Sequence, residues 1–182
     1  MKTYKYKSKH FGFQILIPDD WSGSLMVDLI DRLRHTDASF GTSSGKKSDS
    51  KTIVGPDRKY LNVLITPLLE NELEPTINQT EEYFEGLTYR QNLNVIATGT
   101  IFVASREHFW ATYYRGFLMS LVAGGQIQFF KKYCLYLNRA EYLFTAGLYF
   151  VKAGEKLPAD QEIGDSEKIF DDMVSSMKLS NV

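Results

Sequence analysis

Four long runs of strand-forming residues follow one another in the second half of the sequence, and they constrain the fold more than any other feature. The runs cover residues 95–103, 109–121, 127–137 and 142–151. Turn-forming or polar residues separate them at 105–107, 123–125 and 138–140. Because connections this short join antiparallel neighbours, the sequence predicts a four-strand meander.

The strands of this meander are apolar at odd and at even positions alike. In the second run, Phe109 and Tyr113 point to one face, whereas Trp110 and Tyr114 point to the other. A sheet that is apolar on both faces has to be covered on both faces.

Helices are available as cover. Thr76 and Gln79 match a capping box that opens a helix ending near Arg90. A C-terminal helix is predicted to begin at Asp165 or Ser166, after a polar loop. Its apolar stripe comprises Ile169, Phe170, Met173, Val174 and Met177. Helical spacing also predicts a short helix over residues 24–35.

The N-terminal residues alternate between apolar and polar, as in a half-buried hairpin. Tyr4 and Tyr6 alternate with lysines, and a second strand over 11–17 ends at Pro18. We expect the chain to turn back after Pro18, so that Trp21 packs beneath the hairpin in a structural role. A further strand is predicted over 61–65.

Together these elements predict one domain over residues 1–182, of the α+β class. A single antiparallel sheet of about six to seven strands, ending in the meander, would be covered by helices on both faces. Residues 36–59 are rich in Ser, Gly, Lys and Asp, and we expect them to form a flexible internal loop.

Composition excludes several classes of function. The chain has 21 Lys+Arg and 22 Asp+Glu, so it lacks the basic excess typical of nucleic-acid binding. No window is long and apolar enough to span a membrane. The basic residues at 2–7 are not followed by the apolar run of a signal peptide, so cytoplasm is the default expectation, although an exported form without its leader would look the same.

Motifs for catalysis and cofactor binding are weak. Residues 41–48 suggest a phosphate-binding loop, but the glycine spacing is too short and Lys47 stands where Ser or Thr must follow Lys46. His10, His35 and His108 lack the spacing of a metal-binding pair. We therefore predict no metal and no cofactor.

Cys134 is the single cysteine, so no intrachain disulfide can form. Lys132 shares its strand parity and could lower the pKa of the thiol. No motif for an activated nucleophile surrounds it, so we interpret Cys134 as an inert, buried thiol and predict no catalytic residue.

Aromatic residues crowd the meander, and two interpretations remain open. Most of them could be core and cross-strand pairs. Alternatively, some could line a groove where helical cover is incomplete, because Tyr and Trp combine large apolar area with a polar group. The candidate partner-binding surface consists of Trp110, Tyr114, Tyr136 and Tyr149.

Residues 11–21, with the sequence FGFQILIPDDW, resemble the start of PsbP-like domains. The later order of strand, helix, meander and helix is also similar. The resemblance implies an α/β/α sandwich that mainly binds other proteins, as in photosystem II extrinsic subunits, Ran-binding proteins and chaperones of type VI secretion effectors. The superfamily has no shared catalytic residues, so the resemblance supplies none.

Our leading hypothesis is a non-enzymatic protein-binding module, of the adaptor or chaperone type. Its partner would be another protein, and a homodimer is among the arrangements that such a surface allows. The first alternative is a carrier of small apolar ligands, with a pocket between sheet and helices. The second is an enzyme of a class that its motifs do not reveal.

Overall fold

The computed structural model describes residues 1–7, 12–21, 49–55, 57, 59–91, 93–116 and 125–179. The strands are β1 (Lys2–Lys7), β2 (Gly12–Ile17), β3 (Asp49–Val54), β4 (Tyr60–Pro67), β5 (Leu93–Val103), β6 (Arg106–Arg115), β7 (Gln126–Leu137), β8 (Ala140–Lys152) and β9 (Lys178–Leu179). The helices are α2 (Ile77–Gln91) and α3 (Asp160–Ser175).

The strands form two antiparallel sheets. The smaller has the order β1-β2-β9, and the larger has the order β3-β4-β8-β7-β6-β5. The expectation of a single sheet was therefore wrong. The reason is that the N-terminal hairpin stacks on the large sheet instead of extending it: Phe13 meets the rings of Tyr142 and Phe144 edge-on, at centroid distances of 6.4 and 6.0 Å.

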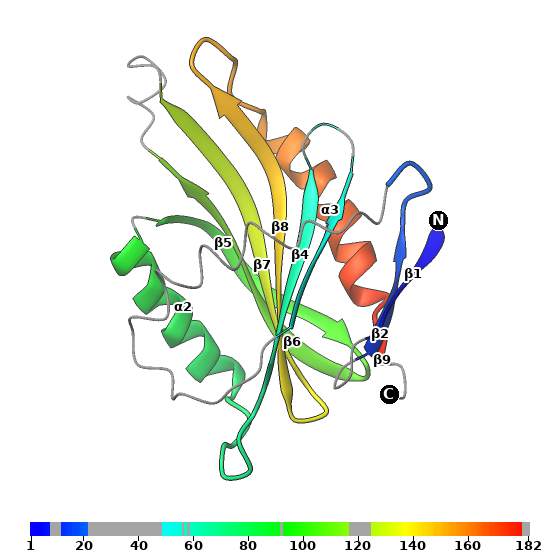
Figure 1. Cartoon of the computed structure of the whole chain (residues 1–182). Coiled ribbons are helices and arrows are strands. Elements are labelled where there is room, and N and C mark those ends of the chain that lie inside the picture. Colours follow the sequence, from blue (N-terminus) through cyan, green and yellow to red (C-terminus); the bar gives the residue numbers. More distant parts are fainter. Residues whose placement is uncertain are drawn as a thin grey trace.

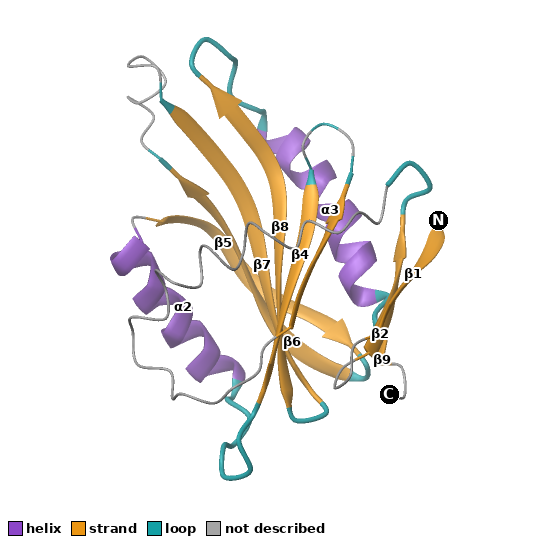
Figure 2. Cartoon of the chain, viewed as in Figure 1, coloured by secondary structure: helices purple, strands orange, loops and turns teal. Residues whose placement is uncertain are grey.

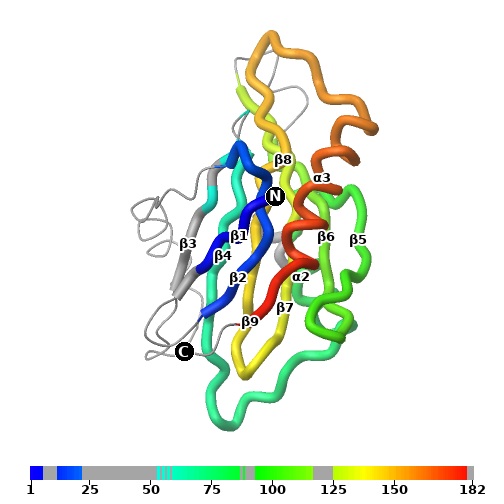
Figure 3. Tube along the Cα trace, turned by 90° about the vertical axis from the view of Figure 1, so that its right-hand side faces the viewer, coloured from blue at the N-terminus to red at the C-terminus, as the bar shows by residue number. Residues whose placement is uncertain are grey.

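The layers are visible in Figures 1 and 2, where the helices lie on opposite sides of the large sheet. Helix α2 covers one face. Helix α3 and the small sheet cover the other, and they lie nearest the viewer in Figure 3. The α+β class and the cover on both faces agree with the sequence prediction.

The predicted meander is present as β5 to β8, each strand pairing with the next. The β5–β6 and β7–β8 connections each use two residues with positive φ, namely Ala104 with Ser105 and Asn138 with Arg139. Such conformations match the twist of the flanking strands in tight hairpins. Strand β6 ends at Arg115, earlier than predicted.

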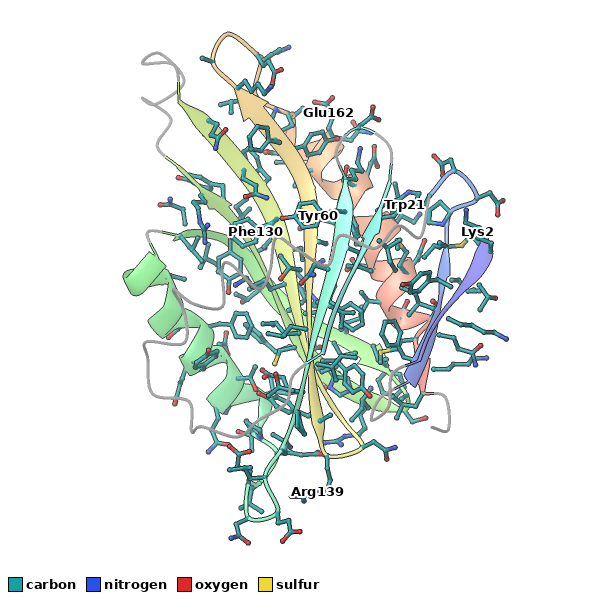
Figure 4. All side chains as sticks on the ribbon, in the orientation of Figure 1. Lys2, Trp21, Tyr60, Phe130, Arg139 and Glu162 are labelled. Atoms are coloured by element: carbon teal, nitrogen blue, oxygen red, sulfur yellow. The ribbon has the colours of Figure 1, made fainter. Side chains whose placement is uncertain are left out.

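Arg139 also holds the loop between β4 and α2. Its Nη2 atom donates to the carbonyl oxygens of Leu69 and Glu70, at 2.6 and 3.0 Å. Figure 4 shows Arg139 at the end of the sheet where this loop lies. The loop projects Leu73 into solvent, with 89% of that residue exposed.

The helix starts differ in how well they were predicted. At α2 the capping box is present: Thr76 N–H donates to Gln79 Oε1 at 2.9 Å, and Gln79 N–H donates to Thr76 Oγ1 at 3.3 Å. Helix α3 begins at Asp160, before the predicted Asp165 or Ser166. The Glu162 carboxylate accepts the Ala159 N–H at 2.6 Å and so fixes the earlier start.

Two N-terminal predictions fall partly or wholly outside the described residues. The helix over 24–35 lies wholly outside them. Within 36–59, where a loop was expected, Asp49–Val54 form β3, which pairs with β4. The mobility of the remainder stays a prediction.

Trp21 is a central residue of the core between the large sheet and α3. It is 2% exposed, and its ring meets Phe170 edge-on at 5.4 Å. Figure 4 shows it beside α3. Gly55 lies so close that a Cβ there would overlap the indole ring. This packing beside the hairpin agrees with the structural role expected from the sequence.

Trp21→Ala is predicted to lower the free energy of unfolding by about 3–5 kcal/mol, because it leaves a large cavity in a packed core. That is a large share of the roughly 5–15 kcal/mol that stabilises a typical domain. Urea unfolding followed by circular dichroism measures the change. Leu73→Ala is the control, since its exposed side chain should alter stability by less than about 0.5 kcal/mol. Equal stability of the two variants would contradict the structural role.

Candidate functional site

A buried positive charge lies beneath α3. The side chain of Lys131, on β7, is 2% exposed, and its Nζ atom is 2.9 Å from Asp171 Oδ1. The same Nζ lies 3.7 Å from the centre of the Trp110 ring, which adds a cation–π contact. A buried lysine needs such partners, because leaving water as an unpaired ion costs several kcal/mol.

Hydroxyl groups complete this cluster. Tyr133 donates to Asp171 Oδ1 at 2.7 Å, and Thr112 donates to Glu167. Burial, and then the Asp171 carboxylate, raise the pKa of Tyr133 far above its usual value, so the phenol keeps its proton and remains a donor. The cluster therefore fastens α3 to β6 and β7, and its polar groups are occupied by one another.

The four aromatic residues predicted as a partner-binding surface do not lie together. Trp110, Tyr114 and Tyr149 belong to the face covered by α3, where Tyr149 donates to the carbonyl oxygen of Glu162 at 2.9 Å and Tyr114 contacts the ring of Phe129. Tyr136 packs on the opposite face, against the cluster that includes Phe84. A binding role for these residues stays a prediction, but they do not form one surface.

Cys134 lies with Tyr136 on the face covered by α2. Its Sγ atom donates to Glu141 Oε1 at 3.3 Å. Burial, and then the charge of Glu141, raise the pKa of the thiol well above its usual value, and these effects outweigh the opposing effect of Lys132. The thiol therefore stays protonated at neutral pH, the opposite of an activated nucleophile.

The histidines offer no metal centre within the described part of the chain. His108 is buried, its Nδ1 accepts the Tyr136 N–H at 3.4 Å, and burial lowers its pKa. His10 and His35 lie outside the described residues. Among the residues that are described, no three His, Cys, Asp or Glu side chains gather as a metal site, and no helix has the length and apolarity to cross a membrane.

A pocket of about 220 Å³ opens on the strands of the large sheet. Its lining residues are Tyr60, Gln128, Gly147, Tyr149 and Phe150. Gln128 donates to the Tyr60 hydroxyl at 2.8 Å, and the Tyr60 ring rests on Gly147, where a Cβ would collide with it. The pocket is smaller than the roughly 300–1,000 Å³ of typical ligand sites, and no helix residue lines it.

Among the described side chains of the large sheet, those of β5 include the most exposed large apolar groups. Val95, Ile96 and Phe102 are 46%, 47% and 64% exposed. No described strand pairs with this edge, which lies along the right-hand side of Figure 3. An unpaired edge offers a row of backbone N–H and C=O groups to another chain.

Strand β5 also lacks the charges and proline that usually protect an edge, and its pairing with β6 is irregular only between Val95 and Ala97. Its eleven residues, LNVIATGTIFV, include neither a charged residue nor proline. The other outer strands differ: β1 carries three lysines, β3 carries Asp49 and Lys51, and β9 has two residues. Charges and short length are the common protection against edge-to-edge pairing. The exposed edge of β5 is therefore our candidate protein-binding site.

No family model matches the sequence, and no curated protein matches it. Among solved structures, PsbP (CyanoP) from the cyanobacterium Synechocystis sp. PCC 6803 matches with a TM-score of 0.57. The match covers 98% of this chain and 92% of that chain, at 13% sequence identity. The chain has a PsbP-like fold.

The resemblance expected from residues 11–21 is thus confirmed at the level of the fold. The PsbP-like fold alone assigns no binding residue at this identity. Sequence reasoning missed the β5 edge, although its uncharged run was visible. The missing information was the pairing order, which leaves β5, rather than another strand of the meander, without an outer neighbour.

Asp171→Asn is predicted to destabilise the protein by about 1–3 kcal/mol. Removing one partner of a fully enclosed ion pair costs about 3–5 kcal/mol, and the 40% exposure of Asp171 lets water offset part of that loss. Asp172→Asn, at the neighbouring exposed position, is the control. Denaturant unfolding compares the two, and equal stability would mean that the pair with Lys131 contributes nothing.

Native Cys134 is predicted to react slowly with a disulfide reagent, even at about pH 8.5, where an unperturbed thiol is half ionised. Burial both blocks access and keeps the proton on sulfur. The control is Leu73→Cys in a Cys134→Ser background, which presents an exposed thiol and should react much faster. Absorbance of the released thiolate measures both rates. Comparable rates would show that Cys134 is accessible and ionised.

Proposed function

We propose that this protein is a non-enzymatic protein-binding module of the adaptor or chaperone type, which receives an extended segment of another protein along β5. In this mode of recognition, a peptide adds a strand to an exposed sheet edge. Main-chain hydrogen bonds supply affinity, and alternate side chains supply specificity.

One observation carries the proposal: an eleven-residue edge strand without charge or proline has no described neighbour on its outer side. Exposed apolar side chains accompany it on the strand itself: Val95, Ile96 and Phe102. Large exposed apolar groups beside an open edge mark an interaction site or an aggregation hazard. A partner strand would remove both the unpaired edge and the apolar exposure.

The chemistry of the described side chains supports binding over catalysis. Two buried reactive groups are engaged internally: Lys131 with Asp171, and Cys134 with Glu141. Neither arrangement combines an activated nucleophile with an accessible cleft.

The carrier hypothesis has less support. It required a pocket between sheet and helices, whereas the pocket beside Tyr60 is lined by strand residues and is small. Ligand sites usually enclose most of the ligand surface, which a pocket of this size does for few molecules.

Titration of isotope-labelled protein with a synthetic strand peptide tests the proposed function. The probe is an uncharged eleven-residue peptide of alternating Val and Thr with blocked ends, matching β5 in length. We expect the backbone amide signals of residues 93–103 to shift. A control peptide with proline at alternate positions should have no effect, because proline removes the donors of a ladder.

Three results would contradict the proposal. Unchanged signals of residues 93–103 would show that this edge does not bind a strand. Equal shifts with both peptides would show that strand pairing is not involved. Shifts confined to Tyr60, Gln128 and Gly147 would instead favour the carrier hypothesis.

A further inference from the structure

We infer that the strand received by β5 is β5 of a second copy of this chain, paired antiparallel across a two-fold axis at Thr100. The inference rests on the proposed function, since it names the partner of the same edge. The result would be a homodimer in which two large sheets join into one continuous sheet.

The residues that follow the irregularity in β5 are complementary in size to themselves. The register with β6 shifts between Val95 and Ala97 and is regular from Ala97 to Val103. With Thr100 on the axis, each remaining pair joins a smaller residue to a larger one: Ala97 faces Val103, Thr98 faces Phe102, and Gly99 faces Ile101. The Trp110 ring already lies over Gly99, so Ile101 of the second copy would pack beside the indole. Cross-strand pairs of this kind are the units that stabilise a sheet.

This register also places the exposed side chains where they gain most cover. Phe102 is 64% exposed, and its ring would lie over the exposed Thr98 of the second copy. The axis repeats this contact, so both phenylalanine rings are covered. Isologous contacts of this type are the usual basis of two-fold dimers.

Charge favours β5 over the other outer strands as a self-pairing edge. A two-fold pair brings a strand against its own sequence, so an uncharged strand meets no like charge. Strand β1, with lysines at positions 2, 5 and 7, would meet its own lysines. Neutrality thus allows self-association at β5 and disfavours it at β1.

Backbone groups at the axis remain able to pair. The indole N–H of Trp110 donates to the carbonyl oxygen of Thr100 at 3.0 Å. A carbonyl oxygen has two acceptor positions, so this bond leaves one for a partner strand. Seven paired residues extend the contact over about 24 Å. One strand pair buries less than a standard interface, so we expect a weak, concentration-dependent dimer.

Thr100 provides a charge test, because its exposed side chain would face the same residue of the second copy. Thr100→Lys places lysine against lysine, and Thr100→Glu places glutamate against glutamate. Sedimentation equilibrium over a wide concentration range measures the mass. We expect wild-type protein to approach twice the chain mass, and each variant alone to dimerise about fivefold more weakly.

Mixing the two variants is the decisive step. Lysine then faces glutamate, and we expect dimerisation to return to at least the wild-type level. Recovery would also show that each variant is folded. Tyr83→Lys and Tyr83→Glu are the matched controls, since Tyr83 is 58% exposed but lies on α2, and they should leave wild-type dimerisation unchanged.

Three results would overturn the inference. The wild type could be monomeric at every concentration, the two Thr100 variants could dimerise as strongly as wild type, or mixing them could fail to restore dimerisation. The Val/Thr peptide then decides the proposed function separately. If the peptide shifts the amide signals of β5, the edge does bind strands, and only the inference that its partner is a second copy of this chain is wrong. If it does not, the proposed function falls as well.

Discussion

The structure depends on one constraint: strands β6 to β8 are apolar on both faces, so neither face of the large sheet can be left to water. On one face Phe84 of α2 packs against Phe109 and Tyr113 of β6. On the other, Phe170 of α3 and Phe13 of β2 are fully buried. The small sheet shares the cover of that face with α3, and Phe13 packs against Tyr142 and Phe144 of β8.

Residue patterns within short segments predicted the elements whose formation depends on neighbouring residues. The meander follows from runs separated by short turns, and the start of α2 follows from the hydrogen bonds between Thr76 and Gln79. The second sheet was not predictable in this way, because it needs β2 to pair with β9 from the other end of the chain. Periodicity shows that a strand is half-buried but not which strand lies beside it. The start of α3 was misplaced because Asp165 and Ser166 resemble a cap, whereas the hydrogen bond from Ala159 to Glu162 decides it.

The candidate site was also hard to predict, because it depends on which strands and helices lie beside one another. Aromatic content suggested a surface at Trp110, Tyr114, Tyr136 and Tyr149, yet a strand sends alternate side chains to opposite faces, and these residues were divided between them. Trp110 proved to be the partner of a buried lysine, a contact that needs α3 in place. The edge of β5 became visible once the order of pairing was known, because exposure of a strand edge is a property of the sheet and not of the strand.

The pairing of β2 with β9 has a consequence for the order in which the chain folds during synthesis. The hairpin β1–β2 leaves the ribosome before the segment that completes its sheet: Phe13 and Gln14 pair with Leu179 and Lys178, and Leu16 N–H donates to Ser176 Oγ at 2.8 Å. These partners are translated after the large sheet and both described helices. The hairpin therefore completes its sheet only after these later elements have been made. Until α3 has formed, the apolar side chains of β2 lack part of their core. Such distant pairings slow folding, because a long loop has to close before the contact forms.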